Sequence, residues 1–179
     1  MRFSVFGIEL EISFLFFVIV ALGFLVDNQS ILYLLLFSAF HEMGHIAALY
    51  LLGGKVDKIT VSYYGIGMSH SSNLSVIKEI IFLMSGVLIN YFFAAFKIQR
   101  EINLALGIIN SLPVYPLDAG RITKLLLDEL LPIGISYEVY IFIAWIFEIV
   151  LIVYAIFTKS INLILIGIYL FFGLIRGNV

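Results

Sequence analysis

The sequence predicts an all-α polytopic membrane protein with about six transmembrane helices and a small membrane-associated β-hairpin. The first observation is composition, because 63% of the 179 residues are hydrophobic and only 12% are charged. The mean hydropathy of +1.14 is well above that of an ordinary soluble domain. The second observation is that the apolar residues form six runs separated by brief polar connections, without a linker or repeat. We therefore expect one transmembrane domain over residues 1–179, with no soluble regulatory domain.

The six apolar runs define the expected spans. They cover residues 12–26, 31–52, 80–96, 102–117, 138–157 and 161–175. Each run is near or somewhat below the roughly 20 residues that a helix needs to cross about 30 Å of hydrocarbon. Residues 3–11 could extend the first run, whereas the run 102–117 ends at prolines and is the weakest of the six. No small-residue cleavage site follows the first run before Asp27, so we expect a retained span and not a signal peptide.

The charged residues predict an orientation and exclude some partners. If the spans alternate from a cytoplasmic N-terminus, seven of the ten basic residues lie on the cytoplasmic side: Arg2, Lys55, Lys58, Lys78, Arg121, Lys124 and Arg176. This bias favours cytoplasmic N- and C-termini. The net charge of −2 is small and scattered, which does not indicate a nucleic-acid partner. The chain has no cysteine, so a disulfide framework and a thiolate metal site are both excluded.

The stretch FSAFHEMGHIAALYLL places three ionisable residues inside an apolar run. On a helix His41 and His45 share one face, so both imidazoles can bind one metal ion, and Glu42 points about 100° away. In this H-E-x-x-H pattern the zinc ion polarises a water molecule and the glutamate takes its proton. An ionisable residue near the bilayer centre costs at least ~2.5 kcal/mol, so a cluster of three indicates function more than chance. Gly44 within the motif would let another backbone approach closely.

Two histidines do not complete a catalytic zinc site, which normally has three protein ligands and a water. The candidates for the third ligand are His70, Glu79, Asp118, Asp128, Glu138 and Glu148. Asp118 is favoured because Pro113 and Pro116 end a helix and deliver this carboxylate at the expected depth. His70 lies in a Ser-rich stretch, where a surface or loop histidine is the better interpretation. Glu148, in the middle of a run, is either functional or simply protonated or hydrogen-bonded to a neighbouring helix.

Three motifs, in this order, carry a resemblance to a known family. They are HEMGH at 41–45, SGVLIN at 85–90 and NSLPVYPLDAG at 110–120. The second resembles a small-Gly-x-x-x-Asn pattern, and the third resembles an Asn-x-x-Pro-x-x-Pro-x-Asp-Gly pattern. Together they resemble the site-2 proteases, which are intramembrane zinc metalloproteases, and within them the branch of stage IV sporulation protein FB. The resemblance implies that Zn²⁺ is the cofactor, that its ligands are His41, His45 and Asp118, and that Glu42 is the catalytic base.

The resemblance also implies a substrate and the residues that position it. Asn110 and Pro116 would help to hold the substrate near the metal. Asn90 and Asn110 could donate hydrogen bonds to the developing oxyanion or to substrate carbonyls, with interhelical hydrogen bonding as an equally weighted alternative. The substrate would be a membrane-embedded or membrane-associated protein, such as a transcription-factor precursor or a pro-sigma factor in sporulation. Regulated intramembrane proteolysis in a bacterial cell membrane is the setting that this resemblance implies.

The chain departs from the family pattern in three places. Ala119 stands where the family usually has glycine after the aspartate, and Val87 replaces a common proline. No CBS domain follows the last apolar run, so the nucleotide-linked regulation of the sporulation branch is not expected here.

The segment GGKVDKITVSYYGIGM at 53–68 differs from the helical pattern. Val56, Ile59, Val61 and two tyrosines favour a strand, and the neighbouring glycines favour turns. We expect a short hairpin, with a plain interfacial loop as the alternative. The edge of a hairpin beside the metal could accept an unwound substrate as an added strand.

A different class of protein uses the same residue types. A metal-binding membrane transporter or subunit without protease activity could also hold a metal with the histidines and Asp118. Such a protein would be expected to repeat acidic or histidine residues along a pathway, and only Glu148 is a plausible further step. Glu42 therefore favours the protease.

Overall fold

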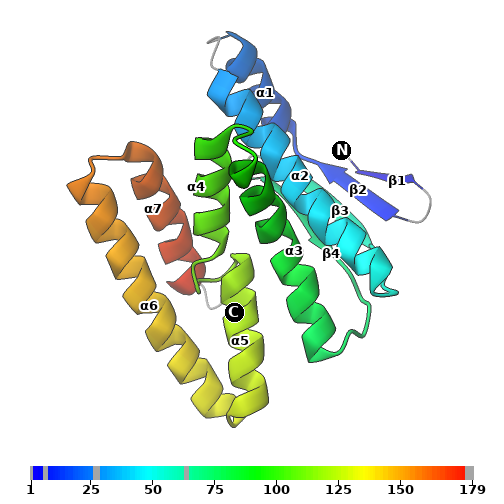
Figure 1. Cartoon of the computed structure of the whole chain (residues 1–179), viewed down its shortest axis with the longest axis vertical. Coiled ribbons are helices and arrows are strands. Elements are labelled where there is room, and N and C mark those ends of the chain that lie inside the picture. Colours follow the sequence, from blue (N-terminus) through cyan, green and yellow to red (C-terminus); the bar gives the residue numbers. More distant parts are fainter. Residues whose placement is uncertain (1, 6–7, 26–28, 63–64, 176–179) are drawn as a thin grey trace. The chain divides into compact units, whose positions relative to one another are not determined.

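The computed structural model describes residues 2–5, 8–25, 29–62 and 65–175. Most of these residues are helical, and a small sheet of four strands accompanies the helices (Figure 1). The chain forms two compact units, Met1–Gly107 and Ile108–Val179, which we describe separately. The expectation of a mainly helical protein with a small β element is confirmed, and the expected single domain stays a prediction. Arg176 and the C-terminus, which entered the orientation argument, lie outside the described residues.

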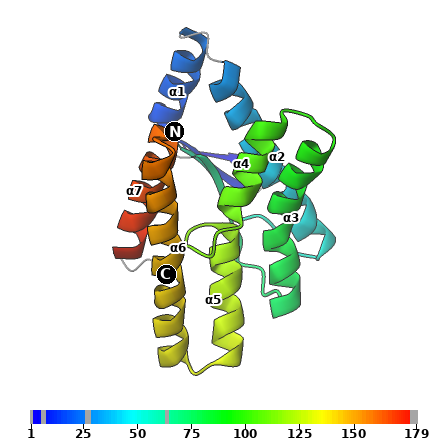
Figure 2. The same ribbon diagram turned by 60° about the vertical axis from the view of Figure 1, so that its left-hand side comes forward.

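The first unit is built on a pair of long helices. Helix α2 (Gln29–Leu51) packs along α3 (Val76–Ala95), and the shorter α1 (Phe14–Leu25) packs against α2 (Figures 1 and 2). Glycine lets the two long helices approach closely, because a Cβ atom on Gly44 would lie 3.0 Å from the carbonyl oxygen of Ser85. The backbone contact expected of Gly44 is therefore present.

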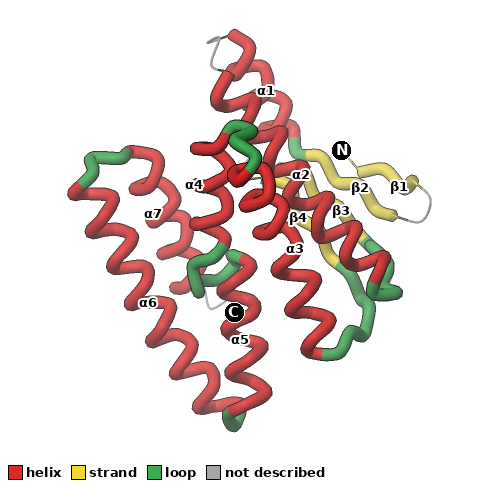
Figure 3. Tube along the Cα trace, in the orientation of Figure 1, coloured by secondary structure: helices red, strands yellow, loops and turns green. Residues whose placement is uncertain are grey.

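The sheet includes more of the chain than a single hairpin. Its order is β1 (Arg2–Val5), β2 (Ile8–Ile12), β3 (Lys58–Ser62) and β4 (Gly65–Ser69), shown in yellow in Figure 3. The expected hairpin is confirmed as the antiparallel pair β3 and β4, although its two tyrosines lie outside the described residues. Strand β2 then pairs in parallel with β3, and β1 pairs antiparallel with β2.

The suggestion that residues 3–11 could extend the first span is wrong, because residues 3–5 belong to β1 and residues 8–11 belong to β2. In β2 the residues alternate between apolar and acidic, which suits a strand with one polar face. Glu11 lies 3.1 Å from Arg2 and 2.6 Å from Lys58 of β3. The hydrogen bond from Lys58, and to a smaller extent the one from Arg2, holds the pKa of the Glu11 carboxyl below its ordinary value.

The expected count of six spans is not confirmed. Within the described residues, three helices are long and apolar enough to cross a membrane: Gln29–Leu51, Val76–Ala95 and Gly134–Phe157. Helix α1 is shortened to 12 residues because the preceding residues join the sheet. Helix α4 (Arg100–Asn110) ends ahead of Pro113 after 11 residues. Helix α7 (Ile161–Ile175) has 15 residues, which at 1.5 Å each cover about 22 Å of the ~30 Å hydrocarbon core.

The second unit is a helical arrangement around one apolar cluster. Helix α5 (Asp118–Leu130) packs on α6 (Ile133–Phe157), and α6 packs on α7. The buried cluster consists of Val114, Tyr140, Ala144, Leu151, Leu170 and Leu174. Tyr140 also fixes the segment before α5, because its hydroxyl accepts a 2.7 Å hydrogen bond from the backbone N–H of Tyr115. The loop that leads to Asp118 is thus tied to a helix of the same unit.

Candidate metal centre

Helix α2 brings His41, Glu42 and His45 together as the sequence predicted. Both histidines are buried, and their Nε2 atoms lie 3.1 Å apart. The ligand atoms of all three residues lie within 4.8 Å of one another. Two nitrogens that bind a tetrahedral zinc ion at about 2.0–2.1 Å are about 3.3–3.4 Å apart. The histidine pair therefore fits one metal ion after a shift of a few tenths of an ångström.

The hydrogen bonds of the two rings support this interpretation. The Nδ1 atom of His45 lies 2.8 Å from the carbonyl oxygen of Phe82, and Nδ1 of His41 lies 2.6 Å from Oδ1 of Asn90. Both partners are acceptors, so each Nδ1 carries the proton and each Nε2 presents a lone pair. Two lone pairs facing each other at 3.1 Å repel unless a cation lies near them. The arrangement is the one in which histidine binds metal.

Gly86 of α3 leaves space next to the two Nε2 atoms. A Cβ atom at this position would lie 2.5 Å from Nε2 of His45 and 2.7 Å from Nε2 of His41. Any side chain here would therefore compete with an ion for the same nitrogens. This contact gives a physical reason for glycine in the SGVLIN motif.

Glu42 lies beside the two histidines. It follows His41 directly in α2, is half-buried, and has a carboxylate oxygen within 4.8 Å of the imidazole ligand atoms.

Asn90 is engaged inside the first unit. Its side chain is completely buried, with Oδ1 at His41 and Nδ2 donating a 3.1 Å hydrogen bond to Oδ1 of Asn103. These contacts correspond to the interhelical alternative, and its predicted substrate contact stays a prediction. Sequence reasoning missed Asn103, Phe82 and Ser85 as neighbours of the histidines. An asparagine inside an apolar run was a signal for Asn103, whereas a backbone carbonyl such as that of Phe82 leaves no signal in a sequence.

The third motif lies in the second unit. Asp118 is the first residue of α5 and is 6% exposed, Asn110 is the last residue of α4, and Pro116 follows a cis peptide bond in the loop between them. The turn is tight, because a Cβ atom on Gly120 would overlap the backbone carbonyl of Val114. The roles predicted for Asp118, Asn110 and Pro116 stay predictions.

His70 follows β4 in a loop, as expected, but its side chain is only 8% exposed. Its Nε2 lies 3.4 Å from Oε1 of Glu79, and its ring packs edge-on against Phe82 with ring centroids 4.8 Å apart. His70 thus contacts the residue whose carbonyl accepts the His45 hydrogen bond.

The remaining candidates for the third ligand have other surroundings. Asp128 interacts with Lys124 at 2.6 Å and with Ser136, and these hydrogen bonds lower the pKa of its carboxyl. Glu138 is exposed, and Glu148 is completely buried in α6 beside Gly167. Within the described part of the chain, three possible metal ligands come together on α2, as His41, Glu42 and His45.

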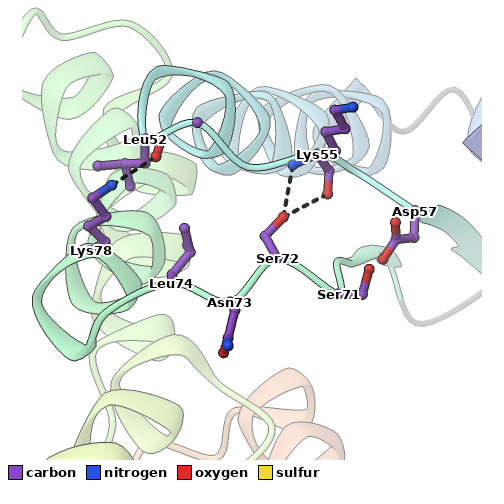
Figure 4. A pocket seen from close by; sticks show the side chains of 9 residues that line it. Leu52, Lys55, Asp57, Ser71, Ser72, Asn73, Leu74 and Lys78 are labelled. Carbon is purple, nitrogen blue, oxygen red and sulfur yellow. Dashed lines mark hydrogen bonds between the residues drawn. The ribbon is translucent and has the colours of Figure 1, made fainter.

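A polar pocket of about 370 Å³ lies where α2 ends and α3 begins (Figure 4). Ser72 holds its walls together, because its hydroxyl accepts from the backbone N–H of Lys55 at 2.9 Å and donates to the Lys55 carbonyl at 3.3 Å. Lys78 donates to the carbonyl oxygen of Leu52 at 3.2 Å. No residue of the histidine group lines this pocket, so the pocket and the candidate metal centre are separate features of the first unit.

A buried His-Glu-His group on a helix long and apolar enough to cross a membrane is the combination expected of membrane-embedded metalloproteases. The model of the Peptidase M50B-like family matches residues 14–115, which is more than half of the chain. The chain therefore belongs to the Peptidase M50B-like family, which includes the site-2 proteases, and the predicted resemblance is confirmed.

Individual relatives agree with this assignment. Zinc metalloprotease MJ0392 of Methanocaldococcus jannaschii is 26% identical over 197 residues, covering 96% of this chain and 58% of that protein. Stage IV sporulation protein FB of Bacillus subtilis is 27% identical over 133 residues, covering 64% of this chain and 46% of that protein. The chain thus spans about half the length of these relatives. The solved site-2 protease from M. jannaschii has the same fold, with a TM-score of 0.70 at 21% identity over 98% of this chain and 94% of that one.

The Gly86→Ala substitution tests the geometry of the metal centre. We expect zinc affinity to fall by more than the roughly 10–100-fold typical of residues behind the ligands, because the methyl group occupies the space at both Nε2 atoms. Zinc content and affinity of detergent-purified protein, measured by metal analysis and chelator competition, check this. Gly134→Ala is the matched control, since a Cβ atom there meets nothing within 4 Å. Equal zinc affinity in both variants would contradict the assigned position of the metal.

Proposed function

We propose that this chain is an intramembrane zinc metalloprotease that hydrolyses a peptide bond of a membrane-embedded or membrane-associated protein. The observation that carries the proposal is the buried histidine pair of α2, with both Nε2 atoms facing each other beside Gly86 and Glu42 next to them. Membership of a metalloprotease family supports a metal at this position, and zinc is the usual one. The helix that carries the group is long and apolar enough to cross a membrane.

Each residue of the histidine group has a separate proposed role in hydrolysis. A bound zinc ion would supply Lewis acidity, which polarises a water molecule and the substrate carbonyl. His41 and His45 would hold the ion through Nε2, while their Nδ1 hydrogen bonds fix the orientation of the rings. Glu42 would take a proton from the water molecule while the oxygen of that water bonds to the carbonyl carbon of the substrate. The same carboxyl then gives the proton to the leaving nitrogen as the carbon–nitrogen bond breaks.

Asp118 is the proposed third ligand. It starts α5 directly after the proline-containing loop, and the family motif that it belongs to is intact at the aspartate. The Tyr140 hydrogen bond and the close backbone approach at Gly120 hold this loop against its own unit, which suits a carboxylate that must be held in place.

Substrate binding requires an unwound peptide, because the peptide groups of a helix are engaged in hydrogen bonds and hidden by side chains. Strand β4 is an edge strand of the sheet and lies against α2, so an extended substrate added to it would run next to the helix of the metal centre. Asn110 and Pro116 are proposed to help position the substrate near the metal. Similarity to stage IV sporulation protein FB supports a membrane-associated regulatory precursor, such as a pro-sigma factor, as the substrate class.

The Glu42→Gln variant separates a protease from a metal transporter. We expect zinc content to remain normal and cleavage to be abolished, because the amide cannot accept the proton of water while both imidazoles remain. Cleavage is measured by co-expression with candidate single-span and membrane-associated substrates, with metal analysis of the purified protein. Glu138→Gln, at an exposed position of α6, is the control. Normal zinc together with near-normal turnover would contradict the role of Glu42.

The Asp118→Asn variant tests the third ligand. We expect zinc binding and activity to fall together, because a neutral amide is a poor zinc ligand. His70→Ala and Glu148→Gln are expected to keep nearly full zinc. Zinc stoichiometry in detergent, with the size-exclusion profile as a folding control, checks all three. Full zinc in Asp118→Asn and loss of zinc in either of the others would show that the third ligand is misassigned.

The proposed orientation in a bacterial cell membrane has both termini in the cytoplasm, as the seven-to-three distribution of basic residues favours. A reporter that is active only in the cytoplasm should be active when it is fused to the C-terminus. The same reporter fused at Lys159 should be inactive, because Lys159 is expected on the opposite side of the membrane. A C-terminal fusion active only outside the cytoplasm would reverse this orientation.

A further inference from the structure

We infer that Asn103 is a positioning residue that sets the tautomer of His41 by orienting the amide of Asn90. The inference rests on the proposed role of His41 as a metal ligand. The contacts form a single chain, from His41 on α2 to Asn90 on α3 and Asn103 on α4.

The contact between His41 and Asn90 does not by itself fix the proton. A side-chain amide has nearly the same shape when its oxygen and nitrogen exchange places. With Oδ1 of Asn90 at His41, the ring must donate from Nδ1, and Nε2 keeps a lone pair for the metal. With Nδ2 in that place, Nδ1 would have to accept, and the proton would lie on Nε2, where it blocks the metal.

Asn103 decides between the two arrangements. Its Nδ2 lies 2.9 Å from the carbonyl oxygen of Ile98 and 3.3 Å from that of Gln99. Backbone carbonyls can only accept, so the NH₂ group of Asn103 must face them and its Oδ1 must face Asn90. Asn90 then has to present Nδ2 to Asn103, at 3.1 Å, and Oδ1 to His41, at 2.6 Å.

Burial makes this order obligatory. Both asparagines are completely buried, so bulk water does not reach their amides to replace a mismatched partner. An exchange at Asn90 would place its oxygen against the oxygen of Asn103 and its NH₂ against an N–H of the metal-binding tautomer of His41.

The carbonyls at the end of the chain belong to the turn between α3 and α4. Lys97 and Gln99 in this turn have φ values of 60° and 41°, in the left-handed region that few residues other than glycine adopt. This bend is what presents two successive carbonyl groups to Asn103. The backbone of a connecting turn is thereby linked to the proton on a metal ligand.

His45 provides an internal comparison. Its Nδ1 donates directly to the carbonyl oxygen of Phe82, without a side chain between the ring and the fixed acceptor. Its tautomer therefore does not depend on Asn103. A change at Asn103 should affect His41 and leave His45 unaltered.

Nitrogen NMR of ¹⁵N-histidine in the metal-free protein tests the inference, because the chain has three histidines. In the unaltered chain Nδ1 of His41 and Nδ1 of His45 should both carry a proton, and a further proton shared between the two Nε2 atoms takes the place of the cation when no metal is bound. Asn103→Leu, which removes the polar atoms at similar size, should convert His41 to a mixture of tautomers without changing His45. Zinc affinity should fall roughly 10–100-fold.

Two further variants sharpen the test. Asn103→Asp should restore both readouts, because a neutral carboxylic acid can donate to a carbonyl and accept from Asn90. Asn162→Leu, at an exposed position of α7, should change neither. An unchanged His41 tautomer in Asn103→Leu, or equal changes at His41 and His45, would overturn the inference. The tautomer is read without zinc or substrate, so this result stands apart from any failure of the protease proposal.

Discussion

The close contact between α2 and α3 is the constraint on which the candidate metal centre depends. Gly44 and Gly86 lie at the point of closest approach, where one lets the backbones meet and the other leaves space beside the histidines. The same face of α3 carries Phe82, Ser85 and Asn90, which are spaced at helical intervals and contact the two rings. A wider separation of the helices would remove both Nδ1 hydrogen bonds at once. The metal centre is therefore a property of the helix pair and not of α2 alone.

Polar groups in a chain this apolar need internal partners, because hydrocarbon offers none. The first unit meets this requirement with a connected set of hydrogen bonds that starts at the imidazoles and ends at backbone carbonyls of α3 and of the turn after it. The second unit uses the same principle on a smaller scale, where the Tyr140 hydroxyl accepts the Tyr115 N–H in the loop before Asp118. In the first unit these contacts orient His41 and His45 of the HEMGH motif, and in the second unit they hold the loop of the NSLPVYPLDAG motif. The hydrogen bonds that stabilise the fold therefore also orient the residues of the proposed chemistry.

The strands show how a local pattern can be overridden by its context. Residues 3–11 directly precede the first apolar run and could have lengthened its helix, yet residues 3–5 and 8–11 belong to two strands. The alternation of acidic and apolar residues in β2 was a usable signal, and the parallel partner β3 was not, because it lies far along the chain. Among the described strands β4 lies at the edge of the sheet and packs against α2, so the sheet and the helix together fix its position.

The sequence by itself determined what depends on spacing along one helix or one strand pair: the apolar helices α2, α3 and α6, the β3–β4 hairpin and the grouping of His41, Glu42 and His45. It did not determine the number of spans, which was expected to be about six. Helical periodicity makes that grouping a local property, so four residues of spacing suffice to predict it. Only the tertiary structure decided what Asn90 contacts, that Asn103 stands behind it and that Gly86 borders the histidine nitrogens. His41 and Asn90 are 49 positions apart, and their contact depends on the rotation and separation of two helices. Neither quantity is encoded in a motif, because it results from the packing of every side chain between them.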